Sequence, residues 1–572
     1  MVVQNSDISE VFEQIADLME IKGDNPFKIR AYRNAARTIG GMPHSVADMV
    51  TQGEDLSTIT GIGKALAQKM EEIVATGTHS LLHKLKEELP ADLLLMLKIP
   101  TLGPKRVKAL HSKLGITTLE ELELAARAGK IRTLDGFGVK TEQGIRAELE
   151  RLQTTEQRLK LVVAEQIATV LTGYLKELPG LSDIEVAGSY RRRKETVGDL
   201  DILVARDREA PIMDHFTTYQ EVERILMKGE TKSSVVLRSG LQVDLRVVPH
   251  RSFGAALQYF TGSQTHNIAI RSRAQKMKLK VNEYGVFKGE EQIAGRSEED
   301  VYTALGLPYI EPELRENRGE IEAALDNRLP RLVSLPDIQG ELHSHTTYSD
   351  GLCSITEMAL AAQARGYEYL AITDHSQRLT IAHGLTVPRL RQQLQEIDYL
   401  ADKMKGIVLL KGIEVDILDD GSLDLPDEIL RELDIVIGAV HSKFKLPLSQ
   451  QTERIIKAMD NPLLHIIAHP SGRLINERAP YDVDMDKIIT AARDRGCFLE
   501  LNAYPDRLDL NDIYCKAAKE MGVKIAISTD AHSLRDLDNI RYGLGQARRG
   551  WLEPEDVLNT HNLENLTKLL QR

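Results

Sequence analysis

Three aspartates in the middle of the chain are spaced to bind divalent metal ions. Asp199 and Asp201 form an Asp-x-Asp pair, and a β-strand would place both carboxylates on one face because successive side chains alternate. Asp244, in the strand-like run 241–245, adds a third hard oxygen ligand. Two Mg²⁺ ions held by such a trio can activate an attacking hydroxyl and stabilise a leaving group. The trio therefore predicts in-line phosphoryl transfer, with these three aspartates as the catalytic metal ligands.

A second group of residues, upstream of the Asp-x-Asp pair, is suited to bind a triphosphate. Gly188 allows the backbone to approach a phosphate closely, and Ser189 offers a hydroxyl group. The next residues include Arg191, Arg192 and Arg193, whose guanidinium groups can pair with phosphate oxygens. An Asp-x-Asp pair alone is typical of a solvated surface strand. Combined with this group and the third aspartate, it predicts nucleotidyl transfer.

The stretch from Gly188 to Val204 resembles the palm of family X DNA polymerases, and the resemblance continues in Tyr259-Phe260-Thr261-Gly262-Ser263. A CCA-adding or polyadenylating enzyme would share Gly-Ser and Asp-x-Asp but should lack the Tyr-Phe-Thr-Gly segment, which therefore favours a polymerase. The resemblance implies that this segment packs against the incoming sugar. It implies nucleotide binding by Gly188, Ser189, Arg192, Tyr259, Phe260, Gly262, Asn267 and Arg271.

In that family the residues matching Asn267 and Arg271 face the nascent base pair and the template strand. Asp244 would accept the proton of the primer 3′-hydroxyl while the two other aspartates hold both metal ions. The implied cofactors are two Mg²⁺ or Mn²⁺ ions, and the implied partners are dNTPs and gapped or primer–template DNA.

Short glycine-containing motifs recur three times in the first 140 residues, at 59–67, 99–106 and 134–140. Each has the turn of a helix-hairpin-helix, which exposes backbone N–H groups at a helix N-terminus and so predicts sequence-independent binding of DNA phosphates. The second copy has Thr101 where a glycine is usual, and it is the weakest of the three. The predicted contacts are Gly61, Gly63, Lys64, Gly103, Lys105, Gly136 and Gly138.

Residues 25–37 resemble the 5′-phosphate-binding helix of the small lyase-type domain of the same family. The resemblance implies that Lys28 and Tyr32 contact a 5′-phosphate and that Lys69 occupies the position of the catalytic Schiff-base lysine. A lysine beside other cations can have its pKa lowered enough to attack an aldehyde sugar. The phosphate-binding lysine expected four residues earlier is Ala65 here, so lyase activity stays open. His79, which lacks partner spacing, is interpreted as a surface histidine.

Short apolar runs alternate with helical patterns beyond residue 336, which predicts parallel strands with crossover helices. Metal-binding residue types follow the runs at their C-terminal ends, where β/α barrels place their chemistry. Mixed imidazole and carboxylate ligands suit up to three Mn²⁺, Zn²⁺ or Fe²⁺ ions, which can activate water to attack a phosphodiester. The nine predicted ligands are His343, His345, Asp350, His375, Glu414, His441, His469, Asp530 and His532.

This half resembles a PHP (polymerase and histidinol phosphatase) domain over residues 337–572, and all nine ligand positions hold competent residues. Lys443 and Arg473, which follow ligand histidines, are candidate contacts for substrate phosphates. The two resemblances imply a bacterial family X polymerase fused to a PHP domain with 3′–5′ exonuclease activity, with abasic-site or 3′-end processing as an extension. The alternatives are a PHP domain that serves as a scaffold or as a non-nucleolytic phosphatase. A metabolic phosphatase fused to a DNA-binding module is disfavoured by the complete palm.

Composition sets limits on location and organisation. The chain has 572 residues, enough for several domains, and only three cysteines, without C-x-x-C spacing. No apolar run of membrane-spanning length and no signal sequence is evident, so we expect a monomeric cytoplasmic protein of the bacterial cytosol or nucleoid, without membrane contact. Residues 1–336 carry only about −2 of the net charge of −12, so the acidic total is no argument against DNA binding by local basic clusters.

The predicted fold class is multidomain. It comprises a helical helix-hairpin-helix N-terminal region, an α+β nucleotidyltransferase palm and thumb, and a C-terminal β/α distorted TIM-like barrel of the PHP type. Pro330 and Pro336 bracket a short connector before the barrel. The predicted ranges are 1–88 for the lyase-type domain, 89–150 for a fingers-type domain, 151–250 for the palm, 251–315 for the thumb, 316–336 for the linker and 337–572 for the PHP domain.

Overall fold

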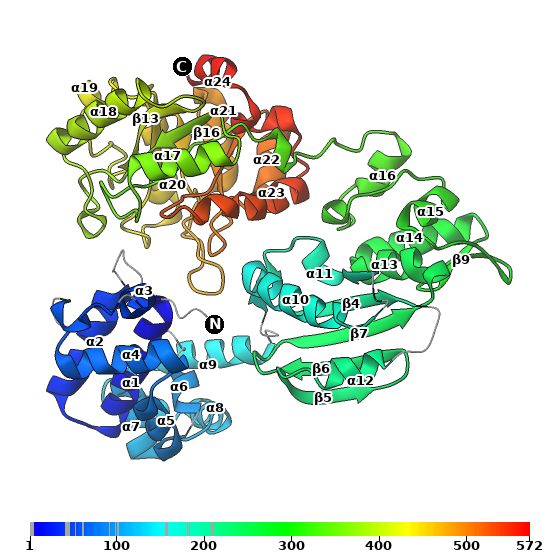
Figure 1. Cartoon of the computed structure of the whole chain (residues 1–572), viewed down its shortest axis with the longest axis horizontal. Helices are drawn as coiled ribbons and strands as arrows, with labels where there is room; N and C mark the ends of the chain where they lie inside the picture. Colours follow the sequence, from blue (N-terminus) through cyan, green and yellow to red (C-terminus); the bar gives the residue numbers. More distant parts are fainter. Residues whose placement is uncertain are drawn as a thin grey trace. The chain divides into compact units, whose positions relative to one another are not determined.

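The computed structural model describes residues 5–40, 46–51, 53–59, 62–90, 92–97, 99, 102–154, 158–179, 181, 183–206 and 211–571. The chain forms two compact units, Met1–Glu156 and Gln157–Arg572 (Figure 1). Among the described residues, no helix combines the length and apolar character that crossing a bilayer requires.

The first unit is helical and has two apolar cores. One core joins α1 (Asn5–Lys22), α2 (Pro26–Gly40), α4 (Lys64–Thr76) and α5 (Ser80–Glu88). The other joins α6 (Asp92–Met96), α7 (Pro104–Leu114), α8 (Leu119–Arg127) and α9 (Val139–Thr154). Short helices joined by tight turns cannot bury their apolar stripes alone, so each packs against its neighbours. The helical helix-hairpin-helix prediction for this region is confirmed.

The second unit begins with a five-stranded palm sheet in the order β2-β4-β7-β6-β5. Its strands are β2 (Ile184–Val186), β4 (Asp199–Ala205), β5 (Val222–Lys228), β6 (Lys232–Leu237) and β7 (Gln242–Val248). The central pair, β4 and β7, is parallel and the other pairs are antiparallel. Helix α10 (Leu161–Lys176) packs an apolar stripe on one face of this sheet, and α13 (Phe253–Thr261) packs on the other. The polar ends of β4 and β7 are therefore held in fixed register.

The thumb-type region comprises α13, α14 (Gln264–Lys276), a small antiparallel sheet of β8 (Lys280–Asn282), β9 (Gly285–Lys288) and β10 (Glu291–Ala294), and α15 (Glu298–Ala304). Residues 316–336, expected as a linker, contain helix α16 (Glu320–Leu325). Ile321, Ala324 and Leu332 pack into the apolar core of the thumb. This segment is thus part of the thumb core, because its apolar residues find a surface to cover there.

Seven parallel strands in sequence order form the C-terminal sheet. They are β11 (Gly340–Glu341), β12 (Tyr369–Ile372), β13 (Val408–Asp416), β14 (Ile435–Ala439), β15 (Ile466–Ile467), β16 (Phe498–Asn502) and β17 (Ile525–Ser528). Figure 1 labels two of them, β13 and β16, among the surrounding helices. A parallel bridge between Ser344 and Ala531, just beyond β11 and β17, closes the sheet into a barrel at its C-terminal end. One apolar cluster fills the barrel and another lies between strands and helices. The predicted distorted TIM-like barrel is confirmed, with seven strands.

Candidate active sites in the palm and the barrel

The palm carboxylates lie at the end of two paired strands. Asp201 on β4 is the direct register partner of Asp244 on β7, and Asp199 lies opposite Gln242. Asp199 is exposed, whereas Asp244 is only 8% exposed. Burial, together with the charges of Asp199 and Asp244, raises the pKa of Asp201 to about 7. A divalent ion would neutralise this crowding, so the three carboxylates fit the predicted metal site.

Asp244 also has cationic neighbours that the sequence did not indicate. The Lys232 Nζ atom lies 3.1 Å from its Oδ2 atom, and Arg246 Nη2 lies 3.6 Å away. Burial opposes ionisation, but hydrogen bonds from Ser234, Gln242 and Lys232 hold the pKa of the Asp244 carboxyl below its usual range. The carboxylate is therefore ionised and can serve as a metal ligand. Its role as proton acceptor for the 3′-hydroxyl stays a prediction.

Gly188 opens the turn that faces these carboxylates. Its φ is +65°, and a Cβ atom at this position would lie 3.0 Å from Asp201 Oδ2. Only glycine suits both the backbone conformation and the close approach. The next residue, Ser189, has a buried Oγ atom with no hydrogen-bond partner among the described residues. An unpaired buried hydroxyl beside a carboxylate cluster is a suitable contact for a phosphate oxygen.

The three arginines that follow are all engaged in ion pairs. Arg191 binds Glu298 at 2.6 Å, and Arg193 Nη1 lies 3.3 Å from Glu165 Oε1. These two therefore serve contacts within the protein, contrary to the expectation that all three offer free cationic groups. Arg192 donates through Nε to Glu316 at 3.0 Å and through Nη1 to the Thr261 carbonyl. A triphosphate that binds the Arg192 Nε–H would have to draw it from Glu316.

The residues predicted to contact sugar and base lie at the junction of α13 and α14. Tyr259 and Phe260 pack edge to face, with ring centroids 5.1 Å apart. The Asn267 amide donates to the Tyr259 carbonyl at 2.6 Å and accepts from Gln258 at 3.0 Å. Asn267 thus holds the two helices together, while Arg271 one turn later is exposed. The base-pair and template contacts of these two residues stay predictions.

Two of the predicted DNA-binding turns end in a glycine that precedes a helix. Gly63 and Gly103 are the N-caps of α4 and α7, and neither helix has a side-chain cap hydrogen bond. The N–H groups at the start of α4, and that of Lys105 in α7 (which begins at Pro104), are thus available to a phosphate oxygen. Lys64 and Lys105, in the first turns, are exposed. Gly61 lies outside the described residues.

The remaining predicted DNA contacts of the N-terminal unit lie in the third turn and on helix α2. Gly136 has a φ of +83°, and Gly138 directly precedes α9. Lys28 on α2 is exposed, as a phosphate contact requires. Tyr32 is only 7% exposed and packs edge-on against Phe12 in the core. Tyr32 is therefore part of the apolar core. Its burial leaves little of the side chain exposed to a phosphate, so it does not support the predicted contact.

Lys69 has a neighbour that the sequence did not reveal. Its Nζ atom lies 3.3 Å from His79 Nε2. His79 is 3% exposed, so its interpretation as a surface histidine was wrong. It is buried because its Nδ1 atom accepts the Leu81 N–H at 2.8 Å and caps α5, which leaves the proton on Nε2. The lyase role of Lys69 stays a prediction.

The barrel brings all nine predicted metal ligands together at the C-terminal ends of its strands. All of them except His343 and His345 line a pocket of about 340 Å³. Glu414 lies at the centre, with Oε2 2.6 Å from His375 Nδ1 and Oε1 3.0 Å from His469 Nε2. Three subsets have ligand atoms that all lie within 4.8 Å of one another: His345, Asp350, His375 and His532; His343, His345 and Asp530; and His375, Glu414 and His441.

The donor atoms of this cluster fit divalent metal ions. Among the described residues, His343 Nε2 and His345 Nδ1 are buried without a hydrogen-bond partner, and His375 Nδ1 and Glu414 Oε2 face each other at 2.6 Å. Burial and the neighbouring His532 and His375 lower the pKa of His345 to about 3, so this ligand is neutral. Despite burial, Glu414 and Asp350 raise the pKa of His375 to about 10. A metal ion would satisfy the unpaired atoms and displace the His375 proton.

Residues behind the ligands fix their orientation. Glu500 accepts a hydrogen bond from His343 Nδ1 at 2.6 Å and from the His469 N–H at 2.6 Å. This leaves His343 Nε2 directed at the cluster. Asp374, adjacent to a ligand histidine, instead accepts hydrogen bonds from Thr346 and Ser349 and anchors their loop. The signal for Glu500 was a lone carboxylate inside the apolar run 498–501.

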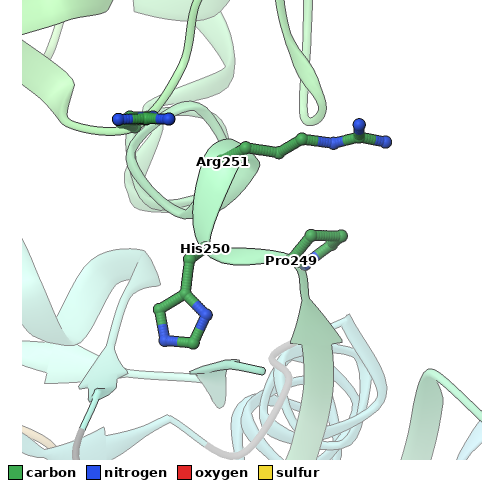
Figure 2. Close-up of a pocket in the computed structure, with 4 residues that line it drawn as sticks. Pro249, His250 and Arg251 are labelled. Atoms are coloured by element: carbon green, nitrogen blue, oxygen red, sulfur yellow. The ribbon is translucent and has the colours of Figure 1, made fainter. Parts of the chain in front are cut away.

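The cation at this pocket differs from the expected ones. Arg507 is the only lysine or arginine among the described residues that line it, and its Nε atom lies 3.8 Å from Asp530 Oδ2. Arg473 instead pairs with Glu195 of the palm at 2.7 Å, and Lys443 is not among the lining residues. A further concavity, of about 450 Å³, lies at the palm–thumb junction. Its His250 and Arg251 side chains point apart (Figure 2), so they are not arranged to act on one bound group.

Models of five known families match consecutive parts of the chain. These are the helix-hairpin-helix domain at 3–79, the SAM-like helix-hairpin-helix tandem at 93–151, the DNA polymerase beta palm at 162–256, the DNA polymerase beta thumb at 256–316 and the PHP domain at 341–504. A palm with this thumb and a metal-binding PHP barrel define a DNA polymerase with a second phosphoesterase site.

Relatives match both the whole chain and its barrel. The "DNA polymerase/3′-5′ exonuclease PolX" of Bacillus subtilis (strain 168) is 40% identical over 574 residues, which cover 100% of both chains. The chain therefore belongs to the bacterial family X DNA polymerases that carry a PHP domain. A "probable phosphatase" of Thermoanaerobacter sp. (strain X514) is 34% identical over 38% of this chain and 89% of its own length. One of Caldanaerobacter subterraneus is 29% identical over 40% of this chain and 90% of its own length.

Proposed function

We propose that this protein fills short gaps in DNA during repair at the palm and removes 3′-terminal nucleotides at the barrel. It is a DNA-directed DNA polymerase and a metal-dependent 3′–5′ exonuclease, and its substrates are DNA and dNTPs. The observation that carries the polymerase half is the register pairing of Asp201 and Asp244 beside the Gly188 turn. The nine-ligand cluster carries the exonuclease half.

At the palm, the chain binds and orients the reactants. Ser189 Oγ and the N–H groups of the Gly188 turn would bind the triphosphate, and Arg192 would add a cationic contact. Tyr259 and Phe260 would pack against the sugar. Asp199, Asp201 and Asp244 would hold two Mg²⁺ or Mn²⁺ ions, which supply activation of the 3′-hydroxyl and charge stabilisation of the leaving pyrophosphate. The carboxylates fix where those charges lie, so attack proceeds in line.

At the barrel, the chain positions a 3′-terminal phosphodiester over the nine-ligand cluster. The nine residues would hold up to three divalent transition metals, of which Mn²⁺ suits the mixed nitrogen and oxygen donors, and these supply water activation. Arg507, at the wall of the pocket, would pair with a non-bridging phosphate oxygen. Glu500 keeps the His343 ring in the orientation that binding requires.

The N-terminal unit would hold gapped DNA without reading its sequence. The N-termini of α4, α7 and α9 follow glycines and offer N–H groups to phosphates. Lys28 would contact a 5′-phosphate. We assign residues 1–88 to the lyase-type domain, 89–150 to fingers, 151–250 to palm, 251–315 to thumb and 337–572 to the PHP domain. The proximity of Lys69 and His79 is compatible with lyase chemistry.

A 5′-labelled primer annealed across a one-nucleotide gap tests both sites in one assay. Wild type, Asp199→Ala/Asp201→Ala and His343→Ala/His345→Ala are compared in Mn²⁺, with and without dNTPs. We expect the palm variant to lose extension and still shorten the primer, and the barrel variant to do the reverse. If the barrel variant shortens the primer as fast as wild type, the exonuclease does not reside in the barrel.

A phosphatase activity is the second candidate for the barrel, because relatives named as probable phosphatases align with it. A primer with a 3′-phosphate separates the two. Release of inorganic phosphate without shortening supports a phosphatase, and release of nucleotides supports an exonuclease. The His343→Ala/His345→Ala variant identifies any background activity.

A further inference from the structure

A helix of the barrel domain contacts the proposed triphosphate-binding turn of the palm. Helix α23 (Ile540–Arg549) lies against residues 192–193, which follow the turn of α11 (Gly188–Arg191). Gln546 Nε2 donates to the Arg193 carbonyl at 2.8 Å. A Cβ atom on Gly545 would lie 3.1 Å from Arg193 Cβ, so helix and turn are in close contact.

Arg549, at the end of α23, connects three parts of the chain. Its side chain is 2% exposed. Its Nη1 atom donates to the Arg192 carbonyl at 2.8 Å and to Glu316 Oε1 at 2.9 Å. Its Nη2 atom donates to Asp512 Oδ2 at 2.8 Å. Every one of these contacts is charge-assisted and shielded from water. Removing one partner would leave the other without a hydrogen bond away from solvent, which is energetically unfavourable.

The same Glu316 oxygen also accepts the Arg192 Nε–H at 3.0 Å. Glu316 therefore shares its charge between a palm arginine and a barrel arginine. If the Arg192 guanidinium turns to a triphosphate, Glu316 loses this hydrogen bond. A largely buried carboxylate without a cation is unfavourable, so the departure of Arg192 is easier if another cation stays. Arg549 stays, because Asp512 and the Arg192 carbonyl hold it.

We propose that Arg549 of the barrel domain is a positioning residue of the polymerase site, which holds the Arg192 backbone and neutralises Glu316 so that the Arg192 guanidinium is released to the incoming dNTP. The inference rests on the proposed triphosphate contact of Arg192. It gives the barrel domain a part in nucleotide binding that is independent of its metal cluster. The barrel's contribution to synthesis then persists when its exonuclease is inactive.

Single-nucleotide gap filling with Mg²⁺ tests this role in the full-length protein. We expect Arg549→Ala to raise KM for dNTP about tenfold, with kcat within about threefold of wild type, because a binding group and not the chemical step is affected. KM for gapped DNA and the Mn²⁺-dependent shortening of single-stranded DNA are expected to stay within about twofold. Arg391→Ala, which removes a surface arginine paired with Glu432 in the same domain, is the matched control and leaves all values unchanged.

A second substitution separates this role from simple packing. Glu316→Gln removes the charge that Arg549 neutralises, so Arg549→Ala/Glu316→Gln is expected to recover KM to within about threefold of wild type. A packing role predicts that the two effects multiply, and that outcome overturns the proposal. Arg549→Lys, which keeps the charge, is expected to lie between wild type and Arg549→Ala, and it replaces the alanine variant if thermal unfolding shows the latter to be unfolded.

Arg192→Ala distinguishes this inference from the proposed function. If Arg192→Ala leaves KM for dNTP unchanged, the triphosphate contact is wrong and the inference falls with it. If Arg192→Ala raises KM and Arg549→Ala does not, only the inference is wrong. A rise in KM for both variants, with rescue by Glu316→Gln confined to the Arg549 variant, supports both.

Discussion

Asp201 and Asp244 are direct register partners on the parallel strands β4 and β7, so two carboxylates lie side by side on one face of the palm sheet. The strand pairing holds them there whether or not a metal ion is bound. The burial and the neighbouring charges that raise the pKa of Asp201 to about 7 are thus a cost of folding. A bound cation relieves this repulsion between carboxylates, so the same crowding favours cation binding.

Asp201→Asn is predicted to abolish synthesis and to stabilise the metal-free protein. Because the folded pKa of Asp201 lies above the unfolded value of 3.8, its ionisation destabilises the fold increasingly as pH rises through about 7. We expect a gain of about 1–2 kcal/mol in the free energy of unfolding at pH 8 in EDTA, and little gain at pH 4. Thermal unfolding measures it. The exposed Asp199→Asn should lose synthesis with a smaller gain, because it removes only one of the charges that raise the Asp201 pKa; an equal gain would contradict the explanation.

Gly188→Ala is predicted to impair synthesis more than it impairs stability. The positive φ costs about 1–2 kcal/mol for a residue with a side chain, and the added methyl group also meets Asp201 Oδ2 at 3.0 Å. We expect gap filling to fall at least about tenfold. Gly289, in the β9–β10 turn, has a φ of +62° and open space around it, so Gly289→Ala shares only the backbone cost. Equal losses of synthesis in both variants would show that the contact with Asp201 is unimportant.

Glu500→Gln is predicted to weaken metal binding in the barrel without altering the palm. Glu500 accepts the His343 Nδ1–H at 2.6 Å, and loss of such a carboxylate typically lowers metal affinity about 10–100-fold. Titration of Mn²⁺ into the exonuclease assay measures the midpoint, and Mg²⁺-dependent gap filling is the internal control. Glu428→Gln, at an exposed site in the same domain, should not shift the midpoint. An unshifted midpoint for Glu500→Gln would mean that His343 needs no such support.

The buried pair His266–Glu320 in the thumb is predicted to make stability acid-sensitive. The two side chains meet at 2.6 Å, and Tyr302 lies at His266 Nε2. Burial lowers the pKa of His266, and although burial opposes ionisation of Glu320, the His266 hydrogen bond holds its pKa below the usual range. Both groups stabilise the fold above their unfolded values, 6.5 and 4.5, and this stabilisation is lost as pH falls through the folded values.

Thermal unfolding from pH 8 to pH 4 tests this assignment. We expect the wild-type midpoint to fall more steeply below pH 6.5 than that of His266→Gln, and the two curves to run parallel above pH 6.5, where other groups such as Asp201 titrate. The double variant His266→Gln/Glu320→Gln removes both titrating groups and is the control. Parallel curves for wild type and the double variant would place the acid sensitivity elsewhere in the chain.

The clustering of the nine residues was predictable from sequence because strand ends leave a recognisable pattern. His343-x-His345 opens the domain, and the later apolar runs, except 498–501, are followed by an imidazole or a carboxylate, which a barrel brings together. The neighbour Asp374 has the same signature and instead anchors the loop of Thr346 and Ser349. Spacing alone does not say which of two adjacent residues faces the pocket.

Two further features show where sequence reasoning stops. Tyr32 lies on the same helical stripe as Ile29 and Ala36, so its burial was readable from the 3.6-residue period, although its phosphate contact stays a prediction. The contact of Arg549 with Glu316 joins residues 233 positions apart, and no local pattern encodes it. Long-range polar networks depend on how domains pack, which periodicity does not describe.

Arg507→Ala is predicted to weaken substrate binding at the barrel without loss of metal. Arg507 is the only lysine or arginine among the described residues lining a pocket that holds Glu414 and the ligand histidines, and a phosphodiester there needs a cationic partner beyond the metals. We expect the exonuclease KM to rise about tenfold or more, with Arg507→Lys intermediate because lysine supplies charge without the two-pronged geometry. Arg478→Ala, which removes an arginine stacked on Phe444 outside that lining, is the control. Metal content of the purified variants decides the interpretation: if Arg507→Ala loses bound metal, the residue supports the cluster through Asp530, and another group must recognise the phosphate.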